Sequence, residues 1–226
     1  MPKILVALDL DRTLTKERIT IEVLEAACQE FGIDTAAMLK EQMLVEANGR
    51  SFFPLEYLSK QLKPSKMDKL AESYIRHAKS KSLLYEDVLP FLDKLAKNDT
   101  LVVIVTYGGN DWQKLKLQAS LLHSYNYIIT DQKNKGLLIS SWRRGKKYVL
   151  PLKDDLIAAD KVILVDDKTS SFESLPFDCI GYLIRRSSDN LLPSQKGSVP
   201  RNVTKIKDLH DILKNLEERN LFNPKS

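Results

Sequence analysis

The chain has 226 residues, of which 43% are hydrophobic and 29% are charged. This balance excludes a disordered or low-complexity chain. Typical domains have ~150 residues, so the length indicates one domain with an insertion, or one large and one small domain. The formal net charge of +5 would help an anionic partner approach. It is weak evidence for nucleic-acid binding, and we expect no nucleic-acid partner.

Cysteine usage and hydropathy indicate the compartment. Cys28 and Cys179 lie far apart and show neither a CxxC pattern nor a metal-ligand spacing, as is usual in a reducing compartment. No apolar run approaches the 18 residues that a membrane span needs, and the N-terminus does not resemble a signal peptide. We therefore expect a cytoplasmic monomer without a membrane span.

Short apolar runs alternate with amphipathic segments along the chain. The runs predict buried strands at residues 4–8, 101–105, 127–129, 162–165 and 180–184. The amphipathic segments predict helices at residues 18–31, 35–47, 54–62, 65–81, 86–98, 110–124, 151–159 and 205–218. Residues 137–140 are expected to form an extra strand or flap, residues 186–202 a loop, and residues 219–226 a frayed end. This alternation predicts an α/β fold with a doubly wound parallel sheet.

Polar side chains follow three of the predicted strands directly. Asp9 and Asp11 follow the first, Thr106-Tyr107-Gly108 ends the second, and Asp166-Asp167 follows the fourth. In a doubly wound sheet, ligands bind beyond the carboxyl ends of the strands. Converging carboxylates repel one another, and a divalent cation with a preference for oxygen ligands, such as Mg²⁺, relieves the conflict. With a hydroxyl, a lysine and glycine N–H groups beside it, this pattern indicates a phosphate-handling centre.

These motifs resemble those of the haloacid dehalogenase superfamily, most of whose members are phosphatases. An apolar run followed by DxDxT is matched by Ile4–Leu8 and Asp9–Thr13. A Thr after an apolar strand is matched by Val102–Thr106, and an acidic pair after a later strand by Val162–Asp167. The motifs occur in the family's order, and the resemblance covers residues 4 to about 184.

The resemblance implies a role for each acidic residue. Asp9 is expected to be the nucleophile that takes the phosphoryl group, and Asp11 the general acid and base. Mg²⁺ is expected to be held by Asp9, the backbone carbonyl of Asp11 and Asp167, with Asp166 either supporting a direct ligand or acting through a water molecule.

Phosphate binding is expected from Thr106, Tyr107 and Gly108 together with one lysine. Two lysines are candidates for that position. Lys153 is favoured because it begins a predicted helix, whose N-terminus attracts anions. Lys147, which follows a glycine as in some relatives and lies further upstream, is the alternative.

The resemblance also implies the domain organisation. Residues 1–15 and 85–226 are expected to form the α/β core, with residues 16–84 inserted as a helical C1-type cap. In the family such a cap excludes water and selects the substrate.

We therefore predict an Mg²⁺-dependent phosphomonoester phosphatase that forms an aspartyl-phosphate intermediate. Its substrate is expected to be a small phosphometabolite or a phosphotyrosine protein. The latter follows from a similarity to effector phosphatases that some bacteria inject into host cells, which would place the protein in the host cytosol. The alternatives are a receiver-like signalling module phosphorylated on Asp, a phosphomutase or phosphotransferase, and an inactive binding module on the same fold.

Overall fold

The computed structural model describes residues 3–48, 50–152, 156–186, 199–219 and 221. The chain divides into two compact units. The α/β unit comprises Met1–Leu14, Tyr85–Thr106 and Tyr125–Ser226, and the helical unit comprises Thr15–Leu84 and Tyr107–Ser124. The helical unit thus contains the segment Tyr107–Ser124 in addition to the predicted insertion, whose action as a cap stays a prediction.

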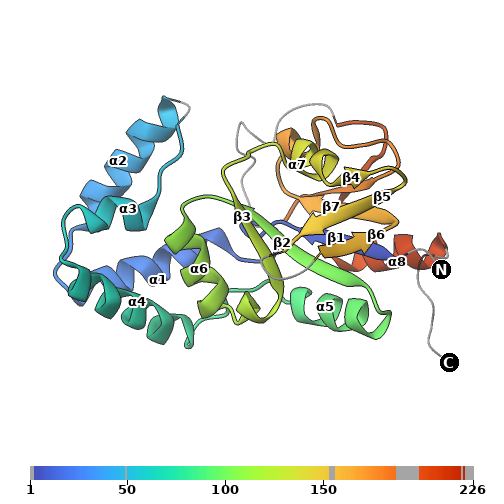
Figure 1. The fold of residues 1–226 in the computed structure, drawn as a ribbon. Helices are drawn as coiled ribbons and strands as arrows, with labels where there is room; N and C mark the ends of the chain where they lie inside the picture. The colour runs from blue at the N-terminus through green and yellow to red at the C-terminus, as the bar shows by residue number, and fades with distance from the viewer. Residues whose placement is uncertain (1–2, 49, 153–155, 187–198, 220, 222–226) are drawn as a thin grey trace. The chain divides into compact units, whose positions relative to one another are not determined.

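The α/β unit is built on a six-stranded parallel sheet with the order β3-β2-β1-β7-β8-β9 (Figure 1). The strands are β1 (Ile4–Leu8), β2 (Leu101–Tyr107), β3 (Asn126–Thr130), β7 (Lys161–Asp166), β8 (Ile180–Ile184) and β9 (Val203–Ile206). The order reverses between β1 and β7, as in doubly wound folds. The predicted fold class and the five predicted strands are confirmed, and β9 is an addition.

The two central strands end side by side. All five residues of β1 are buried, as expected for a strand covered on both faces. Leu8 pairs with Val165 in β7, and the backbone N–H of Asp9 donates to the carbonyl of Val165 at 2.9 Å. The register therefore brings the residues that follow β1 beside the end of β7.

Two local predictions are wrong. Residues 137–140 belong to a helix, α7 (Lys135–Ser141), because the side chain of Asn134 accepts a hydrogen bond from the N–H of Leu137 and caps it. The predicted helix at 151–159 is also wrong, since Leu156–Ala159 is a strand, β6, paired antiparallel with β5 (Lys147–Pro151). Apolar side chains of β5 and β6 pack into the core, and tertiary packing thereby overrides the local pattern. Residues 153–155 lie outside the described residues, as does most of the predicted loop at 186–202.

Helices cover both faces of the large sheet. Figure 1 shows α7 and the small sheet, which β5 and β6 form with β4 (Arg143–Arg144), on one side, and α5 (Val88–Lys97) and α8 (His210–Glu218) on the other. A short 3-10 helix, η2 (Thr169–Phe172), follows β7. The predicted helix at 205–218 is partly wrong, because its first residues pair with β8 as part of β9.

The helical unit has a core of its own. It contains α1 (Glu17–Gln29), α2 (Thr35–Ala47), α3 (Pro54–Ser59), α4 (Pro64–Ala78), α6 (Asn110–Ala119) and the 3-10 helix η1 (Leu122–Ser124). Tyr74 of α4 and Trp112 of α6 pack edge to face, with ring centroids 5.3 Å apart. Five of these six elements match predicted helices, and η1 continues the segment predicted at 110–124.

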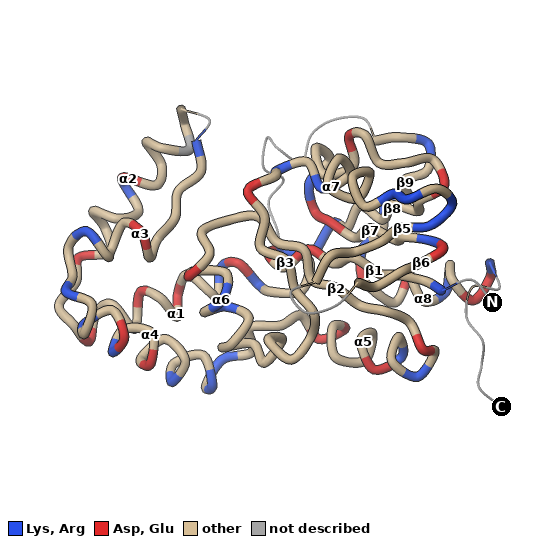
Figure 2. Tube along the Cα trace, viewed as in Figure 1, with Lys and Arg blue, Asp and Glu red and all other residues tan. Residues whose placement is uncertain are grey.

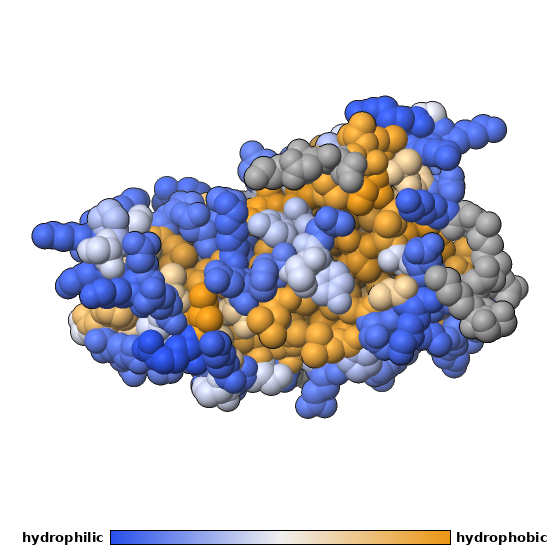
Figure 3. Space-filling model, turned by 60° about the horizontal axis from the view of Figure 1, so that its bottom comes forward, coloured by the Kyte–Doolittle hydropathy of each residue, from blue (hydrophilic) through white to orange (hydrophobic). Residues whose placement is uncertain are grey.

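Some apolar surface stays exposed. Met43, Leu89 and Phe177 are 72%, 60% and 90% exposed, and Figure 3 shows apolar patches bordered by hydrophilic side chains on one face. Apolar atoms make up much of the surface of any folded protein. Within the described residues, no helix has the length and apolar character needed to cross a membrane.

Candidate active site

Three buried carboxylates meet where the strand order reverses. Asp9 follows β1, Asp166 ends β7 and Asp167 comes next in the chain. Each offers a carboxylate oxygen, and these oxygens all lie within 4.8 Å of one another. The predicted convergence of strand ends is the physical reason for this cluster, which we call the acidic cluster. Asp11, the fourth predicted member, is half-buried and is not one of the three.

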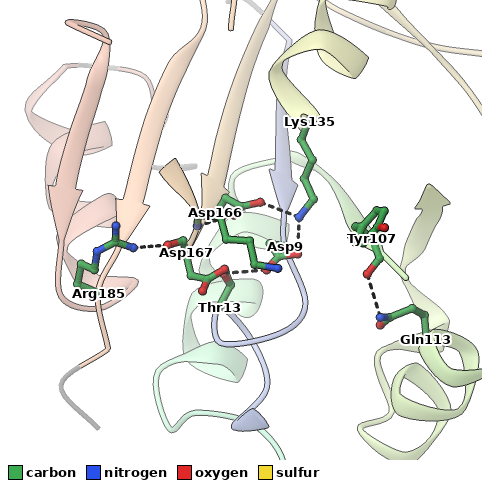
Figure 4. Close-up of polar contacts among 9 residues, drawn as sticks. Asp9, Thr13, Tyr107, Gln113, Lys135, Asp166, Asp167 and Arg185 are labelled. Carbon is green, nitrogen blue, oxygen red and sulfur yellow. Dashed lines mark hydrogen bonds and ion pairs between the residues drawn. The ribbon is translucent and has the colours of Figure 1, made fainter. Parts of the chain in front are cut away.

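A lysine that the sequence analysis did not predict contacts two of the three carboxylates of the acidic cluster. The Nζ atom of Lys135 contacts Oδ1 of Asp9 and lies 2.6 Å from Oδ2 of Asp166 (Figure 4). Only 4% of the lysine side chain is exposed. Lys135 begins α7, shortly after the end of β3. Its position just beyond a carboxyl strand end was the available signal, and the prediction of a strand at 137–140 concealed it.

Of the two predicted lysines, only Lys147 lies within the described residues, and it does not occupy that position. Lys147 lies in β5 with 62% of its side chain exposed, and its Nζ is 3.8 Å from Oδ1 of Asp160. Figure 2 shows basic residues along this part of the small sheet. Lys153 lies outside the described residues.

Two buried threonines lie near the ends of the neighbouring strands β2 and β1. Thr106, near the end of β2, is 1% exposed, and its Oγ1 has no hydrogen-bond partner within the described part of the chain. Burying a hydroxyl without a hydrogen-bond partner costs free energy. The Thr106 hydroxyl is therefore suited to donate a hydrogen bond to an oxygen of a bound anion. Oγ1 of Thr13 donates to Oδ2 of Asp9 at 3.4 Å, a long contact that orients the second carboxylate oxygen.

Tyr107 and Gly108, two predicted phosphate-binding residues, belong to the helical unit. The Tyr107 hydroxyl lies 2.7 Å from Oγ of Ser51, and its backbone carbonyl accepts a hydrogen bond from Nε2 of Gln113 at 3.1 Å. At Gly108 φ is +150°, and an added Cβ would lie 2.4 Å from Nε2 of Gln113. Glycine is therefore required at that turn, and the phosphate-binding role of both residues stays a prediction.

Burial is the largest single influence on the pKa of Asp9. It raises the pKa of Asp9 to about 6, against the opposing effect of Lys135 and with a further rise from Asp166. The pKa of Lys135 is raised although burial acts to lower it, because the charges of Asp166 and Asp9 outweigh burial. Lys135 is thus held in its charged form, whereas Asp9 is a carboxylate in an environment that penalises its charge.

The acidic cluster fits a Mg²⁺ ion. Its donors are hard carboxylate oxygens, the ligands that Mg²⁺ prefers, and a cation would offset the burial penalty on Asp9. Both oxygens of Asp166 already accept hydrogen bonds, Oδ2 from Lys135 and Oδ1 from the backbone N–H of Lys168 at 2.8 Å. The contact of Thr13 with Oδ2 of Asp9 is long, at 3.4 Å, so this oxygen and the carboxylate of Asp167 are the better candidates for direct ligands.

Comparisons with known proteins agree with this geometry. Residues 6–137 match the family model of haloacid dehalogenase-like hydrolases. A protein from Burkholderia xenovorans assigned as a haloacid dehalogenase-like hydrolase is 18% identical, with a TM-score of 0.64 and coverage of 95% of this chain and 99% of that one. A HAD phosphatase from Thermococcus onnurineus is 21% identical, with a TM-score of 0.56 and coverage of 96% and 98%.

A third similar structure contains a metal. YfnB from Bacillus subtilis, assigned as a HAD-hydrolase and bound to magnesium, is 12% identical, with a TM-score of 0.53 and coverage of 95% of this chain and 98% of that one. A search of curated proteins gave no sequence match. At these identities the structures show a shared fold, which is that of the family whose model matches.

Proposed function

Since the chain belongs to the haloacid dehalogenase-like hydrolase family, we propose that it is an Mg²⁺-dependent phosphatase of phosphomonoesters that uses Asp9 as its nucleophile. The observation that carries this proposal is the buried contact of Lys135 with both Asp9 and Asp166. It orients a carboxylate at the point of the sheet where ligands bind. A structural ion pair would need neither a third carboxylate nor the buried, unpartnered hydroxyl of Thr106 near the end of the neighbouring strand.

In the first step, a carboxylate oxygen of Asp9 attacks phosphorus as the bond from phosphorus to the ester oxygen breaks. Asp11 donates a proton to that leaving oxygen, which becomes an alcohol or phenol. The ammonium of Lys135 and the hydroxyl of Thr106 hydrogen-bond to the phosphoryl oxygens. These contacts position the group and balance its charge, which is most of the catalysis that phosphoryl transfer requires.

In the second step, Asp11, now a carboxylate, takes a proton from water, which attacks the phosphoryl group on Asp9. Inorganic phosphate leaves and the Asp9 carboxylate is restored. Asp9, Asp167 and the backbone carbonyl of Asp11 would hold Mg²⁺, which supplies positive charge next to the phosphoryl oxygens.

The substrate is proposed at the level of a class. The helical insertion favours small or slender phosphomonoesters, and the net charge of +5 favours an anionic partner without separating a metabolite from a phosphotyrosine peptide. The proposal that the protein is an effector rests on similarity alone.

A panel of substrates tests the proposal. Hydrolysis of p-nitrophenyl phosphate, phosphoserine, a phosphotyrosine peptide, sugar phosphates and nucleotides is measured with Mg²⁺ and with EDTA. Metal-dependent turnover is expected, and the best substrate selects the class. Phosphate release that requires an added bisphosphate or acceptor would indicate a mutase or phosphotransferase. A stable acyl phosphate without turnover would indicate a receiver-like module.

A further inference from the structure

A buried arginine binds the turn that carries Asp11. Arg186 follows β8 by two residues, and its side chain is 6% exposed. One terminal nitrogen lies 2.6 Å from Oδ2 of Asp87, and the other donates to the backbone carbonyl of Thr13 at 2.6 Å. The guanidinium also stacks over the ring of Tyr85, 4.1 Å from its centroid. These contacts fix the guanidinium from three directions.

The turn that Arg186 contacts needs an external support. It contains Arg12, a non-glycine residue with a φ of 61°, and such left-handed backbone is unfavourable for a residue that carries a side chain. The turn leaves the sheet after Asp9 and closes with a hydrogen bond from the N–H of Leu14 to the carbonyl of Leu10 at 2.9 Å. The carbonyl of Thr13, one residue beyond Arg12, is the atom that Arg186 holds.

Asp9 depends much less on this support. Its backbone N–H donates to β7 through Val165, and its carboxylate contacts Lys135. Asp11 lies within the turn itself, two residues before Thr13. A change at Arg186 would therefore displace Asp11 more than Asp9.

We infer that Arg186 is a positioning residue that sets the place of Asp11 by holding the carbonyl of Thr13, with Asp87 and Tyr85 fixing its guanidinium. This inference rests on the proposed function, in which Asp11 is the general acid. A buried ion pair alone contributes little net stability. A wholly structural role therefore accounts poorly for Arg186, because one of its terminal nitrogens donates to a backbone carbonyl of this turn.

The preceding residue acts in the same way on the other acidic loop. The guanidinium of Arg185 donates to the backbone carbonyl of Asp167 (Figure 4). Two consecutive arginines at the end of β8 thus bind the backbones of the loops that carry Asp11 and Asp167. The end of β8 thereby fixes the spacing between the proposed acid and the proposed metal ligand.

A comparison of two substrates of similar shape distinguishes a displaced Asp11 from a general loss of activity. The leaving group of p-nitrophenyl phosphate departs readily as an anion, whereas phenoxide, whose conjugate acid has a pKa of about 10 like that of tyrosine, requires a proton from Asp11. For Arg186→Lys and Arg186→Met we expect kcat/KM to fall at least about tenfold more with phenyl phosphate than with p-nitrophenyl phosphate. Asp87→Asn, which keeps an acceptor for the N–H of Leu209, should show the same selective loss to a smaller extent.

Arg143→Met is the matched control. Arg143 also pairs with an aspartate, Asp178 at 3.1 Å, and lies over the ring of Tyr148, but it belongs to the small sheet. The Arg143→Met variant should show only a small decrease in kcat/KM, of the same size for both substrates. Hydrogen exchange at the Leu14 amide gives a readout without substrate, and we expect it to be faster in Arg186→Met but unchanged in Arg143→Met.

The outcomes distinguish the two proposals. Equal losses with both substrates in Arg186→Lys and Asp87→Asn, with unchanged exchange at Leu14, would overturn the positioning role while leaving the phosphatase intact. Absence of turnover by the wild-type protein would instead overturn the proposed function, and the role of Arg186 with it.

Discussion

Lys135 and Asp9 form an ion pair that is closed to solvent, with 4% and 8% of their side chains exposed. They lie 126 positions apart in the chain and come from the start of α7 and the end of β1. The same ammonium also contacts Asp166, so one positive charge serves two of the three clustered carboxylates.

Replacement of Lys135 tests which lysine belongs to the active site. Lys135→Met leaves Asp9 and Asp166 buried without their counter-charge, and breaking such a contact costs about 3–5 kcal/mol of unfolding free energy. We expect kcat to fall about 10²-fold or more, by analogy with the loss of other charge-stabilising donors. Urea unfolding and hydrolysis of p-nitrophenyl phosphate measure both effects.

Lys147→Met provides the comparison. Lys147 is exposed, and its removal should change stability by less than about 0.5 kcal/mol and leave kcat unchanged. Lys153→Met, at the other predicted position, should also retain activity. Loss of activity in either variant, together with an active Lys135→Met variant, would show that Lys135 is not the lysine of the active site.

Asp9→Asn should stabilise the metal-free protein at neutral pH. Asp9 has a pKa of about 6 in the folded protein against an ordinary value of 3.8, so the folded state binds more protons between these values. Its contribution to unfolding free energy is therefore present in full below about pH 4 and is lost as pH rises through about 6. With EDTA at pH 7.5, Asp9→Asn should be more stable than the wild type by about 1–3 kcal/mol, and the difference should vanish near pH 4. A difference independent of pH would contradict the burial penalty on this carboxylate.

Magnesium should stabilise the folded protein through Asp167. A ligand that binds only the folded state at about 100 times its Kd adds about 2.7 kcal/mol, which appears as a rise in Tm with added MgCl₂. Asp167→Asn should weaken this rise strongly. As the control, Asp178→Asn alters a carboxylate bound to Arg143 and Tyr148, and it should respond to Mg²⁺ as the wild type does. An undiminished response in Asp167→Asn would remove that residue from the ligand set.

Gly136→Ala should damage the site through the backbone. An added Cβ at Gly136 would lie 2.4 Å from the carbonyl oxygen of Glu173 and 2.7 Å from the N of Leu175. Because these are backbone atoms, α7 must shift and carry Lys135 with it. We expect a loss of about 1–3 kcal/mol together with reduced kcat, whereas Gly145→Ala, which meets nothing within 4 Å but has a φ of +61°, should lower stability alone.

The helical unit has its own pH-dependent contact. Hydrogen bonds from Ser73, Arg76 and His77 lower the pKa of Glu30 to about 2, which links the end of α1 to α4. This contribution is present above about pH 4.5 and is lost as pH falls toward 2. Glu30→Gln should therefore lower Tm at pH 6 but much less at pH 3, and an equal decrease at both values would argue against a charged contact.

The sheet was predictable because its strands are continuous apolar runs. Ile4–Leu8 and the core of β7 are buried on both faces. A short, continuous apolar segment of this kind is typical of a buried strand. By contrast, β6 and α7 depend on long-range packing against the large sheet and on one capping side chain, Asn134. Short segments of this kind carry little local information, and both were predicted incorrectly.

The acidic residues of the site were predictable for the same reason. Asp9, Asp166 and Asp167 directly follow buried strands, and the parallel register forces them together. Lys135 and Arg186 reach the site through side chains from segments whose position only the folded chain defines. For Lys135 the signal was its position shortly after the strand β3, whereas nothing in the local sequence distinguishes Arg186 from the other basic residues.

The most direct test of the central claim is whether phosphate becomes covalently attached to Asp9. Wild-type protein is mixed with ³²P-labelled phosphomonoester and Mg²⁺, quenched in acid within milliseconds, and digested. The account predicts a transient label on the peptide that contains Asp9, absent with EDTA and in Asp9→Asn. Metal-dependent release of phosphate that persists in Asp9→Asn, or a label on another residue, would contradict it.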